Sequence, residues 1–346
     1  MTTEIFPKVT VIVSNYNGWS RGTLKNCLES LIKADYPNLE IIVVDNSSKD
    51  GSTYFINKYF GGIRCIVNNE NNYSSGLNLG IKKSKGKYVI FFNDDVIVSP
   101  HIIRQAVKIM ESDETIALAQ FKLINFFYRN KIDCIGETTD IYGNSVEIAH
   151  DEIDHGQYNV PMEILCAAGS ACILRRSIIK RIGIYDPKFV IGYEDLDFAL
   201  RVWLSGYKVI FIPNTDVFHI RGASYTGKSP EIEKLRLKVK EHFYKNQIST
   251  IIKNYSFKNL IKAVPIVLIM YLLIAIGEVF LRKNLALAFA RFKAIIWNLS
   301  ELPYLLHHRR NVQQIIRKHP DEVFTRLMAE NQFKFIKYYI KWKKIL

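Results

Sequence analysis

The chain has 346 residues, 48% of them hydrophobic, and a formal net charge of +14. This length and apolar content support the cores of about two domains and exclude an intrinsically disordered protein. The five cysteines are scattered, odd in number and without a C-x-x-C pair. They indicate a reducing compartment and exclude a disulfide framework or a zinc–thiolate site.

Charge and glycine content divide the chain near residue 240. Residues 241–346 carry 18 Lys and Arg against 6 Asp and Glu, residues 1–240 are nearly neutral, and 17 of the 18 glycines precede residue 241. We therefore predict a globular domain over residues 1–245 and a basic, hydrophobic, helical region over residues 246–346. The first 14 residues show no basic segment followed by an apolar one, so we predict no signal peptide and a cytoplasmic first domain.

The first domain begins with alternating strand and helix patterns. Almost wholly apolar runs predict strands at residues 8–17, 39–46, 64–69 and 87–95. Apolar residues recur at helical spacing over residues 24–32, between the first two strands. Apolar strands separated by helices indicate an α/β fold with a mostly parallel sheet sandwiched by helices.

Polar side chains follow three of these strands. They are Ser14 and Tyr16 after the first, Asp45 and Asn46 after the second, and Asp94 and Asp95 after the fourth. Ligands of such sheets bind beyond the carboxyl ends of the strands. Each group could be an ordinary turn, but three in succession at one edge favour a nucleotide-type site.

The stretch VIFFNDDVIV, residues 89–98, places two carboxylates between apolar flanks. Burying an ionised carboxylate is costly unless a cation or hydrogen bonds compensate it. Either a turn brings these acids to the surface, or a positive group meets them.

Four segments in this order resemble the family 2 glycosyltransferases. They are VSNYNG, CLESLIKADYPNLEIIVVDNSSKDGS, NNYSSGLNLGIKKSKGKYVIFFNDD and IGYEDLDFALRVWLSGYKVIFIPNTDVFHIRGAS. The resemblance covers about residues 8–225. Within the family, the chain is similar to the rhamnosyltransferase-like subset. It implies a GT-A fold, in which a Rossmann-like nucleotide-sugar half merges with an acceptor half. It also implies inverting transfer of a sugar from a nucleoside diphosphate.

The resemblance implies a divalent cation, and Mg²⁺ or Mn²⁺ favours oxygen ligands. The family's D-x-D element falls on residues 93–95, where Asp95 is the expected ligand. Asn93 departs from the strict motif, leaving the role of Asp94 open within the donor site. His219 is the second expected ligand, although a lone histidine after an apolar strand is more often structural. Arg221 could pair with phosphate or be a solvated loop residue.

The segment GYEDLDFALRV supplies carboxylates at the start of a helix. Acidic residues there are ordinary partners of the helix dipole. Inversion by direct displacement, however, needs one base. The resemblance makes Asp195 that base, with Glu194 binding the acceptor or tuning the base. We expect Asp197 and Arg201, four residues apart, to form a supporting ion pair.

The resemblance also assigns the remaining site residues. Ser14 and Tyr16 would contact the base and ribose, and Asp45 and Asn46 would complete that pocket. Gly76 and Asn78 would line the donor side, unless they only mark a helix start. Gly169 and Ser170, following Ala168, would lie on the acceptor side. We interpret HDEIDH, residues 150–155, as a solvated loop rather than a metal site.

The C-terminal region contains an uncharged run over residues 263–277. Spanning a membrane takes about 20 apolar residues, and basic residues flank the run on both sides, so the sequence gives no clear crossing. Residues 285–306 have the pattern of an in-plane amphipathic helix. We expect peripheral or re-entrant attachment to the anionic cytoplasmic membrane face. A packed helical subdomain is the alternative, and the uncharged run argues against nucleic-acid binding.

The sequence therefore predicts a metal-dependent, inverting, membrane-associated glycosyltransferase of cell-envelope polysaccharide biosynthesis. It would use a dTDP-, UDP- or GDP-linked sugar and a lipid-linked or polysaccharide acceptor. The alternatives are a non-catalytic nucleotide-sugar-binding protein and a polyprenyl-phosphate glycosyltransferase. A nucleotidyltransferase would need a glycine-rich phosphate loop, which VSNYNG lacks. A homo-oligomer is compatible with the sequence.

Overall fold

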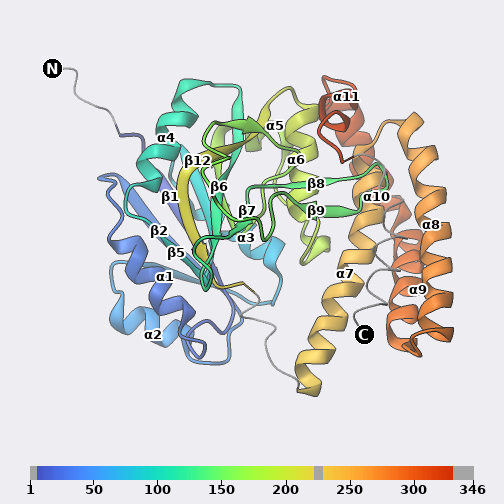
Figure 1. Ribbon diagram of the computed structural model, residues 1–346, viewed down its shortest axis with the longest axis horizontal. Helices are drawn as coiled ribbons and strands as arrows, with labels where there is room; N and C mark the ends of the chain where they lie inside the picture. Colours follow the sequence, from blue (N-terminus) through green and yellow to red (C-terminus); the bar gives the residue numbers. More distant parts are fainter. Residues whose placement is uncertain (1–5, 222–228, 330–346) are drawn as a thin grey trace.

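The computed structural model describes residues 6–221 and 229–329. Its first part is an α/β layer structure, and its C-terminal helices stand beside that structure (Figure 1). The strands of the main sheet are β1 (Val9–Asn15), β2 (Leu39–Asn46), β3 (Arg64–Asn68), β4 (Tyr88–Asn93), β5 (Val96–Val98), β6 (Ile116–Asn125), β7 (Ile132–Cys134), β10 (Met162–Glu163), β11 (Ala171–Arg175) and β12 (Lys208–His219). A small hairpin joins β8 (Glu137–Thr139) and β9 (Ser145–Glu147).

The predicted mostly parallel sheet is confirmed. Its order is β10-β12-β6-β11-β4-β1-β2-β3, with β5 paired to β12 and β7 to β6. Strands β1 to β4 are mutually parallel, so their carboxyl ends meet at one edge. Strand β11 runs antiparallel between β4 and β6 and joins the two halves of the sheet.

Helices cover both faces of the sheet because the strands bury side chains on both. In β1, Val9, Val11 and Val13 pack in one core and Ile12 in the other, as the two-residue period of a strand requires. The helices of this part are α1 (Thr23–Ile32), α2 (Ser52–Tyr59), α3 (Tyr73–Lys83), α4 (Ile102–Ser112), α5 (Ile179–Ile182) and α6 (Glu194–Leu204). Residues of α1, α2 and α4 lie in the first core, and residues of α3 and α6 in the second.

The C-terminal helices share the second core. They are α7 (Pro230–Asn254), α8 (Phe257–Phe280), α9 (Leu285–Ser300), α10 (Leu302–Asn311) and α11 (Glu322–Thr325), with a π-helical turn at Val312–Ile316. Tyr255, Leu305 and Phe324 are fully buried among side chains of the α/β part. The predicted division between residues 245 and 246 falls inside α7, a continuous helix whose last ten residues are buried.

Helices α8 and α9 form a hairpin with one packed and one exposed face. The packed stripe of α8 contains Ala263, Val267, Tyr271, Ala275 and Glu278 at helical spacing. Among the described residues, α8 is the one helix long and apolar enough to cross a membrane by length and composition. The helix has 24 residues and continues beyond the uncharged run on both sides.

Buried ion pairs hold α7 against α6. Lys253 Nζ lies 2.8 Å from Asp186 Oδ2 and 3.0 Å from Asp197 Oδ1. The predicted pair of Asp197 and Arg201 is present at 2.9 Å. Although burial raises it, Lys253 and then Arg201 hold the pKa of Asp197 well below its usual range. The helical region is therefore anchored to the helix that carries the predicted base.

We expect Lys253→Ala to lower the free energy of unfolding by about 3–5 kcal/mol, because it leaves buried carboxylates without their cation. Lys293→Ala removes the lysine of an exposed pair with Glu241 and should cost at most about 1 kcal/mol. Denaturant unfolding of both variants checks the difference. Equal stability would show that Arg201 alone compensates these carboxylates.

Candidate active site

A cavity of about 480 Å³ opens at the carboxyl ends of the parallel strands. It gathers eleven of the predicted site residues: Ser14, Tyr16, Asn46, Asn93, Asp94, Asp95, Gly169, Ser170, Glu194, Asp195 and His219. They come from six separate segments of the chain, which meet because the parallel strands end at this edge and β12 returns to it.

One end of the cavity has the donor set of a cation site. Asp95 Oδ1 is buried and has no hydrogen-bond partner among the described residues. His219 Nε2 lies 3.4 Å from that oxygen. His219 Nδ1 lies 2.7 Å from Asp133 Oδ2, which turns the other ring nitrogen toward Asp95. A carboxylate behind a histidine is the usual support of a metal-bound imidazole. These residues fit Mg²⁺ or Mn²⁺.

Asp133 was not predicted, because it lies 86 positions from His219 in the sequence. Although burial lowers it, the hydrogen bond to Asp133 and the neighbouring carboxylate of Asp95 raise the pKa of His219 to about 9. Arg221 Nη1 also lies 3.0 Å from Asp133 Oδ1, and its other nitrogen pairs with Glu147. Arg221 is therefore not simply a solvated loop residue. Its ion pairs hold the aspartate behind His219.

The structure answers the question raised by Asp94, the first of the two acids in residues 89–98. Asp94 accepts hydrogen bonds from Arg21 Nη2 at 2.9 Å and from the Tyr16 backbone N–H at 3.3 Å. Burial, opposed by Arg21, raises the pKa of Asp94 to about 7. A Cβ on Gly18 would lie 2.3 Å from Asp94 Oδ2, so glycine is required there. Asp94 lines the cavity, but its oxygens fix the loop after β1.

Only some of the residues predicted for the nucleotide site line the cavity. Asn46 Nδ2 donates to Ser14 Oγ at 3.0 Å, and both residues line the cavity. Asp45 does not line the cavity; it accepts from Asn15 Nδ2 at 2.6 Å and from the Ser48 N–H at 2.9 Å. Neighbouring strand residues point to opposite faces, so Asp45 and Asn46 cannot share one pocket wall. Asp45 instead shapes the turn after β2.

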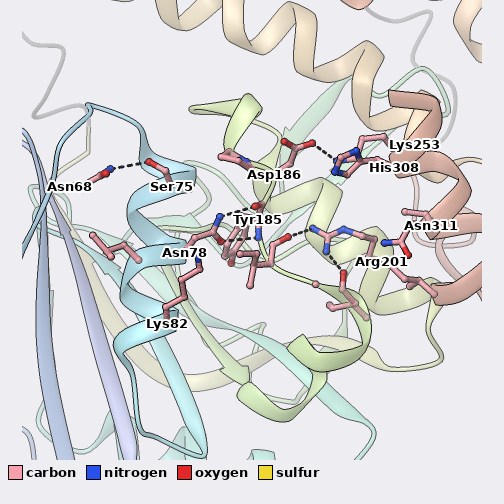
Figure 2. A pocket seen from close by; sticks show the side chains of 17 residues that line it. Asn68, Ser75, Asn78, Lys82, Tyr185, Asp186, Arg201, Lys253, His308 and Asn311 are labelled. Carbon is pink, nitrogen blue, oxygen red and sulfur yellow. Dashed lines mark hydrogen bonds and ion pairs between the residues drawn. The ribbon is translucent and has the colours of Figure 1, made fainter. Parts of the chain in front are cut away.

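Gly76 and Asn78 also lie outside the cavity, contrary to the sequence expectation. A Cβ on Gly76 would lie 2.3 Å from Asn46 Oδ1, so the glycine permits close packing of α3 on β2. Asn78 hydrogen-bonds both the carbonyl and the N–H of Tyr185. It faces a second cavity of about 490 Å³, shown in Figure 2. Lys253 pairs with Asp186 in this cavity. The cavity therefore lies where the C-terminal helices pack against the α/β part.

The predicted base lines the same cavity as the cation site, at the start of α6. Asp195 Oδ1 accepts from the Leu196 N–H at 2.8 Å. Burial raises the pKa of Asp195, although hydrogen bonds from the backbone N–H groups of Leu196 and Gly169 act to lower it. Glu194 Oε2 is buried without a partner among the described residues. Burial and then Asp195 raise the pKa of Glu194 well above its usual range.

Glu137, which was not predicted, adds a third carboxyl group beside the base. Ligand atoms of Glu137, Cys166 and Asp195 lie within 4.8 Å of one another. Burial and the Asp195 charge raise the pKa of Glu137 to about 8 and that of the Cys166 thiol far above its usual range. A thiol that keeps its proton is a poor metal ligand. The cluster is thus suited to holding a proton next to Asp195.

Tyr73 connects the two halves of the cavity. Its hydroxyl lies 3.0 Å from Asn93 Oδ1 and 2.9 Å from the Gly169 carbonyl. The Asn93 N–H donates to the Ser170 carbonyl at 3.2 Å, so the predicted acceptor-side loop abuts the end of β4. Tyr73 lies in the NNYSSG segment, whose family resemblance was the only sequence signal for it.

Residues 150–155 approach this site at one end. His150 Nδ1 lies 3.0 Å from the Asp133 carbonyl and also contacts Arg221. Asp154 forms an ion pair with Lys122. The segment is not a metal cluster, but His150 supports the network behind His219 and is not simply part of a solvated loop.

Comparison with known proteins identifies relatives of this chain. The family model described as Glycosyl transferase family 2 matches residues 10–183. A glucosyltransferase of Escherichia coli, named UDP-Glc:alpha-D-GlcNAc-diphosphoundecaprenol beta-1,3-glucosyltransferase, is 30% identical over 203 residues, 58% of this chain and 72% of its own. A poly(ribitol-phosphate) beta-glucosyltransferase of Bacillus spizizenii is 25% identical over 221 residues, 62% of this chain and 32% of its own. The chain spans 20–38% of the length of the first four curated relatives.

Solved structures share the fold. A mannosyltransferase from Pyrobaculum calidifontis, in complex with GDP-Man and Mn²⁺, has a TM-score of 0.52 and 16% identity over 86% of this chain and 88% of its own. GalNAc-T7, with UDP, GalNAc and Mn²⁺, has a TM-score of 0.58 and 18% identity over 90% of this chain and 59% of its own. These similarities confirm the predicted α/β fold of the GT-A type.

We expect Asp133→Asn to weaken Mn²⁺ binding by about 10–100-fold, the usual effect of losing the carboxylate behind a metal-ligating histidine. Asp113→Asn, which changes an exposed carboxylate paired with Lys208, should leave binding unchanged. Calorimetric titration with Mn²⁺ measures both. Unchanged affinity of the Asp133 variant would remove His219 from the cation site.

Proposed function

Because this chain belongs to glycosyl transferase family 2, we propose that it is an inverting glycosyltransferase that uses a nucleoside-diphosphate sugar. The acceptor is a hydroxyl group of a lipid-linked or polysaccharide glycan. The observation that supports this most is that one cavity holds both the Asp95–His219 pair and the Asp195–Glu194 pair. A departing diphosphate and a hydroxyl that loses its proton need these two groups.

The donor would lie across the ends of β1, β2 and β4. Ser14, Tyr16 and Asn46 form the nucleotide wall. Asp95 and His219 would hold Mg²⁺ or Mn²⁺, which stabilises the charge of a diphosphate leaving group. Tyr73 and Asn93 fix the loop of Gly169 against this end, so donor and acceptor surfaces keep their relative position.

Asp195 takes the proton of the acceptor hydroxyl. Its raised pKa makes the carboxylate a stronger base than an exposed aspartate. The Leu196 and Gly169 N–H groups orient it. With a neighbouring carboxyl group such as Glu137 holding a proton, the charge of Asp195 is not opposed by a second full negative charge.

We expect Asp195→Asn to lower transfer by about 10²–10⁴-fold, the usual contribution of a general base, while donor affinity stays within a few-fold. Asp216→Asn, a carboxylate outside the cavity, is the matched control. Nucleotide release and thermal stabilisation by nucleotide sugars measure the two effects, with UDP-glucose and a GlcNAc-diphosphate lipid tested first, as the name of the Escherichia coli relative suggests. A wild-type protein that binds donor without turnover would instead be a nucleotide-sugar-binding protein.

The second part of the proposal is that the protein attaches to an anionic membrane face through α8 and α9. Large apolar side chains are exposed along both helices: Phe257, Ile261, Ile269, Leu272, Leu273, Ile276, Phe280, Leu285, Phe289, Phe292, Ile296 and Leu299. Arg282 and Lys283 lie exposed at the tip of the hairpin. An apolar surface this extended is typical of a membrane or protein contact, and the basic charge of the region favours anionic lipid.

The packed stripe of α8 favours attachment in the plane of the membrane over a crossing. Tyr271 Oη hydrogen-bonds Gln247 Oε1 at 2.8 Å. Glu278 and Arg291 form a buried ion pair at 3.1 Å between α8 and α9. A crossing by α8 alone would separate it from α7 and α9 and break both contacts, whereas in-plane attachment preserves them.

We expect the double variant Leu273→Glu, Phe289→Glu to lose binding to vesicles of anionic and neutral phospholipid. These side chains are 63% and 60% exposed, so the changes should not unfold the protein. Tyr54→Glu, an equally exposed site on α2, is the control. Vesicle co-sedimentation measures binding, and high salt alone should not release the wild type. If the wild type ignores vesicles and dimerises through this face, the surface is an interface between copies.

A further inference from the structure

Helix α7 forms a wall of the active-site cavity. The residues that line the cavity from this helix are Leu235, Lys238, Val239, His242 and Phe243. Their spacing of three or four residues places them on one face of the helix. Tyr244 and Gln247, one and four residues after Phe243, hydrogen-bond to Tyr271 of α8. In Figure 1, α7 accordingly stands between the α/β part and the α8–α9 hairpin.

His242 is a polar group without a structural role in this wall. Both of its ring nitrogens are buried, and neither has a hydrogen-bond partner among the described residues. Buried polar atoms without partners are rare and call for an explanation. Burial, with Lys245 and Lys238, lowers the pKa of His242 to about 4. The ring is therefore neutral near pH 7, with one nitrogen that donates and one that accepts.

The position of His242 relative to the base is fixed by the next turn of α7. Asn246 Nδ2 donates to the carbonyls of Phe189, Ile191 and Gly192, the segment that leads directly into Glu194. A Cβ on Gly192 would lie 2.3 Å from Phe243 Cε2, so this glycine allows the aromatic ring to reach the cavity. Phe243 packs edge-on against Tyr193 and keeps 42% of its surface exposed.

The chemistry of this corner suits a neutral, hydroxyl-bearing ligand. Glu137, Glu194 and Asp195 all line the same cavity, and the negative charge of Asp195 disfavours a phosphate next to it. The second oxygen of Glu194 also lacks a partner among the residues described. An unpaired carboxyl oxygen, an unpaired neutral imidazole and an exposed aromatic face match the hydroxyl groups and the apolar side of a sugar ring.

We propose that α7 forms the acceptor subsite, where His242 hydrogen-bonds a hydroxyl of the acceptor saccharide and Phe243 contacts the ring. His242 is thus a specificity-determining residue, because it helps to select which acceptor hydroxyl lies at Asp195 for deprotonation. This inference rests on the proposed glycosyl transfer. It also places acceptor recognition on the helix that supports the membrane-facing hairpin.

Steady-state kinetics of His242→Ala, with UDP-glucose and the GlcNAc-diphosphate lipid as first probes, tests the proposal. We expect the acceptor KM to rise about tenfold, the effect of losing about one hydrogen bond. The donor KM and the hydrolysis of donor without acceptor should stay unchanged. His242→Gln, which keeps a donor and an acceptor, should recover part of the affinity, and Phe243→Leu should also raise the acceptor KM. His307→Ala, at an exposed position of α10, is the matched control.

An unchanged acceptor KM in both His242 variants would overturn the proposal. So would an equal loss in donor hydrolysis, because it would place His242 in the donor site or in general packing. A wild-type protein that hydrolyses no nucleotide sugar would instead refute the proposed function.

Discussion

The pairing of Lys253 with Asp186 and Asp197 is the interaction on which the geometry of the site depends. Asp197 lies in the first turn of α6, two residues after Asp195, and its side chain is wholly buried against α7. Lys253 and Arg201 fix that turn from behind, so Asp195 and Glu194 must face the cavity. The same ion pairs attach α7, and through it the α8–α9 hairpin. Charge compensation within one buried cluster thus sets both the position of Asp195, the proposed base, and the attachment of the helical region.

Partners, rather than residue types, decide what each carboxyl group of the site does. Asp94 and Asp95 are neighbours, yet Arg21 holds Asp94 in the loop after β1, whereas Asp95 keeps a free oxygen beside His219. Asp133 orients that histidine and is held in turn by Arg221. Near Asp195, burial and then the Asp195 charge raise the pKa of Glu137 and Glu194. The same kind of side chain thus supplies both the proposed cation ligand and the proposed base.

Helix α7 connects the two functions proposed for the protein. Its 25 residues present His242 and Phe243 to the cavity and Tyr244 and Gln247 to the hairpin. A glycan carried by a membrane lipid has its sugar near the membrane surface. A helix with one face in the active site and the other under a membrane-facing hairpin is a rigid means of holding the site at that surface.

The sequence by itself determined the strands, their shared edge and the central site residues. Apolar runs are local signals, and the ordered motifs placed Ser14, Asp95, Asp195 and His219 in one site. Side-chain partners that lie far apart in the sequence could not be predicted from it. Asp133, Glu137 and His242 lie on segments with no motif, and Asn78 meets Tyr185 across 107 positions.

The C-terminal region shows the same limit. Its uncharged run predicted a helix and an apolar surface, but the buried stripe of α8 depends on where α7 and Arg291 lie. Periodicity records which residues share a face, whereas the direction of that face is decided only when distant segments pack and each buried polar group finds its partner.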